Sequence, residues 1–376
     1  MSAKSILETL YAPHKVFKEI IQNQKFMGPL LVMILFIAAG TASQYAKNNK
    51  IYLQQTTPTS TDINNPDPWT EDSKLWISNA NVTNNGNDHI LGKNSIQFNM
   101  ENDTRMLMKL NATFSINCIE ADGYKNLTFA LKWIQPSAAA PENVTLYLFS
   151  QSEANYLYTN LTGKVDALGN SNWGNLTIPL GPSVGQWTNS TPQATWSNIT
   201  GFKMSVVWPQ SAKSNLTVLI DRMFFSSNNY ESLGTVPGND ITYSVFTFAV
   251  DFALYWMIFG IVLFVVARLL STKAELKTLL IIIGYSLIAF FVMQVVLGIF
   301  YAAMPSLKIS LDGTIQPMSI YTLLVSFTYY VTLLFPIWSI VITALGMREA
   351  FNLTMRRSII VAVIAFFPYY LLLLIG

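Results

Sequence analysis

Five long apolar segments divide the chain into parts. They cover residues 27–46, 243–270, 278–303, 319–345 and 358–375. Each is long enough to cross a bilayer as a helix, which takes about 20 residues. The sequence therefore predicts an α-helical membrane protein with five transmembrane helices, in which residues 241–376 form a compact bundle of four.

A polar region between the first two apolar segments shows a different pattern. After a linker at residues 47–70, rich in Thr, Pro, Asn and Asp, apolar and polar residues alternate in short runs separated by turn residues. The strands are expected near Leu75 and Ile96 and over 106–118, 127–133, 144–149, 156–161, 176–180, 202–208 and 216–225. This pattern predicts an all-β domain at residues 71–240, a β-sandwich or jelly roll.

Basic residues cluster beside the apolar segments on one side. They are Lys4, Lys15, Lys18 and Lys25 before the first segment, Arg268, Lys273 and Lys277 between the second and third, and Arg348, Arg356 and Arg357 between the fourth and fifth. The positive-inside rule places the N-terminus in the cytoplasm, and residues 47–240 and the C-terminus outside a plasma membrane. About 26 residues precede the first apolar run, which favours an uncleaved anchor over a signal peptide.

Residues 1–26 form a cytoplasmic juxtamembrane segment in this topology. A short helix is expected from Pro13, with Phe17, Ile20 and Ile21 on one face, lying along the inner membrane surface. Small residues from Ala38 to Ser43 favour close packing of the first span against another helix.

The polar region is rich in Asn-x-Ser/Thr acceptors for N-linked glycans. They lie at Asn81, Asn102, Asn111, Asn126, Asn143, Asn160, Asn175, Asn189, Asn198 and Asn215. Strand alternation turns several of them away from the core, as a glycan requires. We expect a glycoprotein. A further acceptor, Asn352, falls in a cytoplasmic loop and is expected to be unmodified.

Two runs in the apolar part of the chain resemble a known family. LYAPHKVFKEII from Leu10 and IWSIVITALGMREAFNLTMRRS from Ile337 are similar to the Yip family of five-span membrane proteins. The resemblance implies a membrane role; eukaryotic relatives interact with Rab-type GTPases and act in membrane traffic. The large insertion after the first span is unusual for that family.

A second resemblance lies in the polar region. WGNLTIPL from Trp173, WSNITGFKMSV from Trp196 and LTVLIDRMFF from Leu216 are similar to the closing strands of galactose-binding-like carbohydrate-binding modules. The resemblance implies sugar stacking on loop aromatics, with Trp173, Trp187 and Trp196 as candidates, although packing is the alternative for each. It also implies that Asp221 supports the last strand or a structural calcium. One carboxylate is a weak basis for calcium, and no other cofactor is expected.

The chain carries little chemistry for catalysis. Its two histidines, His14 and His89, lie in different parts, so neither a paired-His metal site nor a Ser-His-Asp triad is predicted. Glu101, Asp103, Glu120, Asp122, Glu142 and Asp221 are the carboxylates available for glycoside hydrolysis, but we expect no enzyme. The single cysteine, Cys118, continues a buried alternation. A glycosylated surface domain without disulfides is typical of an archaeal cell surface.

Polar residues at similar depth in four predicted spans suggest an intramembrane layer. They are Asp251, Gln294, Ser326, Tyr330 and Tyr369. A charged group in hydrocarbon costs about 3 kcal/mol, so such a residue normally has a partner or lines water. The layer is either a proton, ion or headgroup site or a hydrogen-bonded brace.

Composition agrees with these interpretations, because 51% of the residues are hydrophobic and only 12% are charged. We expect a non-enzymatic membrane glycoprotein that binds or scaffolds at the cell surface. The expected partners are the lipid bilayer and a surface glycan, surface-layer protein or membrane-complex subunit, with no nucleic acid. In the alternative, the helical bundle transports a solute or organises the membrane, and the outer domain is a lid or docking surface.

Overall fold

The computed structural model describes residues 3–59, 67–236, 241–269, 274–310 and 314–375. They form two compact units. The helical unit comprises Met1–Tyr52, Ser232–Ile309 and Thr314–Gly376, and the sandwich unit comprises Leu53–Glu231 and Ser310–Gly313.

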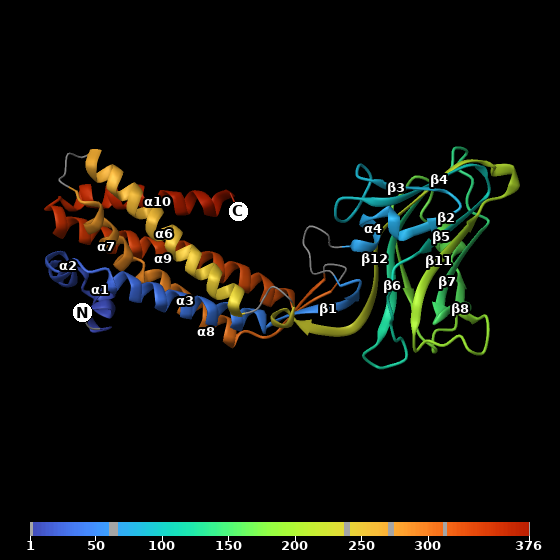
Figure 1. The fold of residues 1–376 in the computed structure, drawn as a ribbon, viewed down its shortest axis with the longest axis horizontal. Coiled ribbons are helices and arrows are strands. Elements are labelled where there is room, and N and C mark those ends of the chain that lie inside the picture. The colour runs from blue at the N-terminus through green and yellow to red at the C-terminus, as the bar shows by residue number, and fades with distance from the viewer. Residues whose placement is uncertain (1–2, 60–66, 237–240, 270–273, 311–313, 376) are drawn as a thin grey trace. The chain divides into compact units, whose positions relative to one another are not determined.

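The helical unit is a bundle of long apolar helices (Figure 1). Its helices are α1 (Ala3–Tyr11), α2 (Pro13–Gln22), α3 (Met27–Asn48), α6 (Ile241–Leu269), α7 (Leu276–Ser286), α8 (Ile288–Ala303), α9 (Met318–Phe351) and α10 (Met355–Ile375). At one end of this unit lie α1, α2, the end of α6, the start of α7 and the turn between α9 and α10. The basic residues that flank the predicted spans belong to these segments or adjoin them, except Lys273, which lies outside the described residues. The topology itself stays a prediction.

Within the described residues, four helical segments are long and apolar enough to cross a membrane: Met27–Asn48, Ile241–Leu269, Leu276–Ala303 and Met318–Phe351. They agree with four of the five predicted spans. The fifth predicted span coincides with α10, which is a helix but is not one of these four. The fifth crossing stays a prediction.

The third span is interrupted at Leu287, between α7 and α8. The Ser286 hydroxyl donates to the Ile283 carbonyl at 2.8 Å, and the Ser339 hydroxyl of α9 donates to the Ser286 carbonyl at 3.0 Å. A break inside hydrocarbon is costly unless its backbone groups find partners. Ser339 supplies one of them from the neighbouring helix.

The short helix α2 packs against α9. Phe17 is fully buried, and its ring lies 3.1 Å from the position that a Cβ on Gly346 would occupy. Lys18 Nζ lies 3.9 Å from Glu349 Oε2. Protein therefore covers the side chains of Phe17 and Ile20. The position of this helix along the inner membrane surface stays a prediction.

The sandwich unit is formed by two antiparallel sheets, as predicted (Figure 1). In the first sheet β3 (Asn81–Asn85), β4 (Ser95–Asp103), β12 (Ser214–Ser232), β6 (Tyr124–Ile134) and β9 (Gly174–Pro179) follow in this order, and β1 (Ile51–Thr57) also pairs with β12. The second sheet has the order β10 (Thr188–Asn189), β8 (Ser152–Asn160), β7 (Asn143–Ser150), β11 (Ile199–Val207), β5 (Arg105–Leu110) and β2 (Trp76–Ser78).

Alternate residues of both sheets fill one core. Every second side chain along β6 is buried, from Leu127 to Trp133, and the same holds from Phe202 to Trp208 along β11 and beyond. Trp133 and Trp208 are core residues, as predicted. Cys118 is also in this core, where burial raises the pKa of its thiol to about 12 and leaves it inert.

The predicted linker at residues 47–70 differs from the structure. Residues 51–57 form β1, and residues 68–71 form the short helix α4, whose Trp69 is 6% exposed in the sandwich core. In residues 51–57 the alternation of apolar and polar residues is too short to predict a strand. Residues 60–66 of the predicted linker lie outside the described residues.

Candidate functional site

One row of side chains crosses the outer face of the second sheet. Strand pairing sets Lys109 of β5 opposite Lys203 of β11, and Lys203 opposite Tyr147 of β7. Tyr147 in turn lies opposite Tyr158 of β8, which pairs with Thr188 of β10. Because neighbouring strands lie about 4.8 Å apart, the four steps of this row span about 19 Å.

Three tyrosines of this face surround a hollow of about 640 Å³. The ring centroids are 5.5 Å apart for Tyr147 and Tyr156, 6.3 Å for Tyr147 and Tyr158, and 6.1 Å for Tyr156 and Tyr158. The other lining residues are Asn143, Thr145, Thr159, Asn160, Gln186, Thr188, Asn189 and Ser190. We call this site the tyrosine hollow. Aromatic rings and neutral hydrogen-bonding groups line it, and no charged side chain does.

A positive charge lies at the edge of the tyrosine hollow. Lys203 Nζ is 4.5 Å from the centre of the Tyr147 ring and 5.7 Å from that of Phe149, which is within cation–π range. The neighbouring Lys109 forms an ion pair with Glu153. In the part of the chain that the structure describes, Lys203 forms no ion pair.

Three predicted glycan acceptors stand at the rim of the same hollow. Asn143, Asn160 and Asn189 are all lining residues, and all are exposed. Asn160 Nδ2 donates to Asn143 Oδ1 at 3.4 Å. Glycans at these positions would therefore leave the protein beside the tyrosines.

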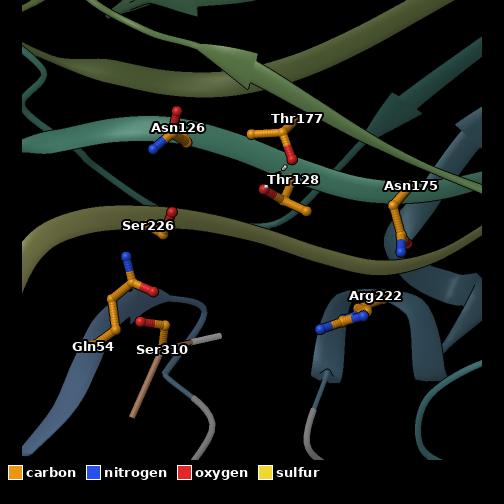
Figure 2. Close-up of a pocket in the computed structure, with 8 residues that line it drawn as sticks. All are labelled: Gln54, Asn126, Thr128, Asn175, Thr177, Arg222, Ser226 and Ser310. Atoms are coloured by element: carbon orange, nitrogen blue, oxygen red, sulfur yellow. Dashed lines mark hydrogen bonds between the residues drawn. The ribbon is translucent and has the colours of Figure 1, made fainter. Parts of the chain in front are cut away.

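A second, smaller hollow of about 260 Å³ lies on the outer face of the first sheet (Figure 2). Figure 2 shows Thr128 of β6 and Thr177 of β9 facing each other, and their hydroxyl oxygens are 3.3 Å apart. The glycan acceptor motifs that begin at Asn126 and Asn175 thus lie side by side on paired strands. The remaining lining residues are Gln54, Asn126, Asn175, Arg222, Ser226 and Ser310. This hollow has no aromatic lining residue.

The predicted tryptophans do not form a common platform. Trp196 is 6% exposed and packs in the sandwich core, with its ring 5.2 Å from that of Trp187. Trp187 is half-buried, and its Nε1 donates to the Pro179 carbonyl at 2.9 Å. For Trp196 the packing alternative describes the structure, because burial leaves no ring face for a sugar.

Trp173 belongs to a separate polar cluster. Its Nε1 donates to Asp88 Oδ1 at 2.7 Å, and Lys132 Nζ lies 2.8 Å from Asp88 Oδ2. Partial burial opposes ionisation of Asp88, but the hydrogen bonds from Lys132 and Trp173 hold the pKa of this carboxyl below its usual value. The half-buried Trp173 ring is therefore fixed by a charged partner.

None of the ten predicted glycan acceptors lies in the core. Eight of the side chains are exposed, and those of Asn126 and Asn198 are half-buried. Their orientation is the one that strand alternation predicts. Modification itself stays a prediction.

Asp221 is buried at a bulge of β12, where it anchors the backbone of one other segment, at Ile90 and Leu91. Its Oδ2 accepts from the backbone N–H groups of Ile90 at 2.5 Å and Leu91 at 3.1 Å, and its Oδ1 accepts from Arg222 N at 2.6 Å. The Thr70 hydroxyl lies 3.2 Å from Oδ1. Three backbone N–H groups thus point at this carboxylate, whereas the Thr70 hydroxyl has one hydrogen and donates it to Asp67 Oδ2 at 2.5 Å. These surroundings do not fit a calcium ligand, because a cation would face the same N–H dipoles; they fit support of the last strand.

A second buried carboxylate, Asp67, lies close to Asp221. Its Oδ2 accepts from Thr70 Oγ1 at 2.5 Å and Met223 N at 2.6 Å, whereas its Oδ1 is buried without a partner. Burial, opposed by these hydrogen bonds, raises the pKa of Asp67 to about 7, and the charge of Asp221 adds to the effect. Burial also raises the pKa of Asp221. Sequence patterns did not single out Asp67.

The other carboxylates considered for catalysis lie on the surface. Glu101 and Asp103 line a polar hollow with Asn81 and Asn215, and Glu120, Asp122 and Glu142 are exposed. No group of three or more His, Cys, Asp or Glu side chains gathers within the described residues in a way that suits a metal ion.

Comparison with known protein families finds a match in the later part of the chain. Residues 191–376 match the Yip1 domain. The matched range begins before β11 and continues through α10, so it includes the predicted Yip-like run at residues 337–358. The Yip1 domain and the apolar helices together indicate a multi-pass membrane protein. No curated protein matches the chain.

The five residues of the predicted intramembrane layer differ in their exposure. Asp251, Gln294 and Ser326 are half-buried, and Tyr330 is 63% exposed. Tyr369 is buried and donates its hydroxyl to the Thr332 carbonyl at 3.1 Å. Among the described residues, no hydrogen bond joins any two of the five.

Solved structures similar to this chain include carbohydrate-binding modules and a glycoside hydrolase domain from Streptococcus pneumoniae. One of them, from work on carbohydrate-binding modules of the β-sandwich superfamily, is 12% identical in sequence to this chain and has a TM-score of 0.27. The alignment covers 41% of this chain and 58% of that module's chain. A family 11 carbohydrate-binding module from Clostridium thermocellum, in complex with a β-1,3-1,4-mixed-linked tetrasaccharide, is 11% identical and has a TM-score of 0.27. The alignment covers 41% of this chain and 90% of that module. A xylan-binding family 22 module from Paenibacillus barcinonensis is 10% identical, with 43% and 97% covered and a TM-score of 0.26. These values say nothing about the ligand of this chain.

The tyrosine hollow was not predicted, although the sequence holds a signal for it. Leu146 and Leu148 point into the core at 0% exposure, so Tyr147 between them must face solvent. Tyr156 and Tyr158 flank the buried Leu157 in the same way. Large aromatic residues on a polar strand face are the signal.

Proposed function

We propose that this chain is a non-catalytic membrane glycoprotein that binds a glycan in the tyrosine hollow. The observation that carries the proposal is the set of three clustered tyrosine rings bordered by amide and hydroxyl groups. Aromatic faces suit the C–H faces of a sugar ring, and neutral polar groups at their edge suit its hydroxyls. The tyrosine hollow combines both requirements.

The strand geometry supports an extended ligand. Tyr147 and Tyr158 are cross-strand neighbours, and Tyr156 lies on the same face two residues before Tyr158. Because the rings lie on paired strands rather than on loops, little ordering is required when a ligand binds. An oligosaccharide chain is therefore a better fit than a single sugar.

The proposed location is the outer side of a plasma membrane. The positive-inside rule supports a cytoplasmic N-terminus, and the ten glycan acceptors of the polar region support an external sandwich. A surface polysaccharide or the glycans of a surface-layer protein are then the ligands within reach.

Binding of the full chain in lipid nanodiscs to a glycan array tests the proposal. We expect a defined set of glycans to bind, and the double change Tyr147→Ala and Tyr158→Ala to weaken binding at least tenfold. Ile77→Ala is the matched control, because Ile77 is exposed on the same sheet but outside the tyrosine hollow. The proposal fails if no glycan binds, or if the double variant binds as the parent does.

The alternative places the function in the Yip1 domain, as transport or membrane organisation. It is supported by the match to this domain and by Asp251, a half-buried carboxylate within a candidate span. Exchange of Asp251 for Asn and for Leu separates two roles. A brace tolerates Asn and loses stability with Leu, whereas a proton path loses transport with both. A stoichiometric protein that co-purifies from native membranes would favour a role as a complex subunit.

A further inference from the structure

We infer that the tyrosine hollow prefers glycans that carry an anionic substituent, a carboxylate or a sulfate, and that Lys203 provides this preference. The inference rests on the proposed function and names the ligand class of the same site. It comes from the row of side chains on the second sheet, in which a lysine continues the line of tyrosines.

Strand register fixes the position of the charge. Lys203 of β11 is the direct cross-strand neighbour of Tyr147, which is the direct neighbour of Tyr158. Its Nζ lies 4.5 Å from the centre of the Tyr147 ring. A sugar that stacks on Tyr147 therefore has an ammonium group within reach of its substituents.

The charges nearby leave Lys203 as the source of a net positive field. Glu153 and Lys109 neutralise each other in an ion pair, and no carboxylate lines the tyrosine hollow. Lys203 itself forms no ion pair with a described residue. An ammonium group has three N–H donors, and contact with a ring face does not consume their capacity for an anion.

A merely structural role for Lys203 makes a different prediction. A lysine that only covers the Tyr147 and Phe149 rings contributes packing, and that contribution is equal for neutral and acidic ligands. A lysine that binds an anion contributes only when the ligand carries a charge, and salt screens this contribution. The ratio of the two affinities is the quantity that separates the roles.

Paired ligands of equal backbone measure this ratio. With the full chain in nanodiscs, we would titrate oligogalacturonate against its methyl ester, and dextran sulfate against dextran. We expect at least one acidic ligand to bind about fivefold or more tightly than its neutral partner at low salt, and the ratio to fall towards one at about 0.5 M salt. The pair that shows the effect identifies the carboxylate or the sulfate as the substituent.

Variants of one residue complete the test. Lys203→Gln should abolish the preference for the acidic ligand and leave neutral binding within about twofold, whereas Lys203→Arg should keep the preference. Lys93→Gln is the control for loss of an exposed lysine elsewhere, since Lys93 does not line the tyrosine hollow. Equal unfolding temperatures show that the variants are folded.

The outcomes distinguish the two proposals. Binding of neutral and acidic ligands with equal affinity, or an unchanged preference in Lys203→Gln, overturns the role of Lys203 and leaves glycan binding intact. Absence of binding to every array glycan and to all four titrated ligands overturns the proposed function and this inference with it.

Discussion

Lys203 and Tyr147 are direct neighbours across paired strands, with the Lys203 ammonium 4.5 Å from the centre of the Tyr147 ring. The two residues come from β11 and β7, which lie in the interior of the second sheet. Their separation is therefore set by backbone hydrogen bonds and not by a loop. A site on such rigid elements holds its geometry before a ligand arrives.

The two faces of β7 and β8 should respond differently to truncation. Leu146→Ala removes a fully buried side chain and should lower the free energy of unfolding of the sandwich unit by about 2–5 kcal/mol. Tyr158→Ala, at a 36% exposed position, should cost much less and act mainly on glycan binding. Thermal unfolding followed by tryptophan fluorescence compares them. Equal losses of stability would show that the tyrosines are part of the core.

Glycan occupancy tests the predicted topology. We expect mass spectrometry of protein from its native membrane to find modification among the ten acceptors of the polar region, and none at Asn352. Asn352 follows α9 at the end of the helical unit where α1 and α2 lie (Figure 1). A glycan at Asn352 would reverse the orientation of the whole chain.

The rim acceptors should control access to the tyrosine hollow. Asn143, Asn160 and Asn189 line it, so glycans on them would compete with an external ligand. Changing all three to Gln keeps an amide at each position and removes the acceptors. We expect the affinity for the external glycan to rise several-fold in protein from the native membrane, and to change little in protein made without N-glycosylation.

The free energy of unfolding of the sandwich unit should fall as the pH rises from about 4 to about 7. Its cause is Asp67, whose pKa is raised from 3.8 to about 7 in the folded state by burial. Between these values the folded protein binds more protons than the unfolded chain, so the stabilisation is full at low pH and is lost as pH rises towards 7. The total change is on the order of 4 kcal/mol.

Asp67→Asn provides the control for this effect. Asparagine keeps an oxygen that accepts from Thr70 and Met223 and carries no charge to bury. Unfolding temperatures between pH 5 and pH 8 should decline in the parent and decline less in the variant, in which Asp221 is retained. Parallel curves for the two proteins would assign the pH dependence to other groups, of which Asp221 is the nearest.

Close packing of the first span depends on glycine. A Cβ added at Gly28 of α3 would lie 1.8 Å from the hydroxyl of Tyr285, whose side chain is fully buried in α7. Gly28→Ala should therefore destabilise the helical unit by about 1–3 kcal/mol. Gly298→Ala in α8 is the matched control, because its Cβ would meet Ser43 at an ordinary distance of 3.4 Å. Thermal unfolding in detergent measures both variants.

Periodicity along the chain determined much of the architecture. Alternation predicted most of the strands and their core side chains, although β3 and β10 were not expected and the strand expected over 106–118 ends at Leu110. Apolar length predicted the helices. Both signals depend on neighbours in sequence. The break at Leu287 and the strand at residues 51–57 were missed. The first depends on Ser339 of another helix, and the second depends on pairing with β12.

What the sequence by itself determined is the class of each segment and the face on which each side chain lies. It placed Tyr147 and Tyr158 on a solvent face and Trp196 near a turn. Only the tertiary structure decided that the tyrosines meet beside Lys203, and that Trp196 is buried against Trp187. The physical reason is that period fixes the orientation of a side chain relative to its own strand, whereas strand order and register fix which side chains become neighbours.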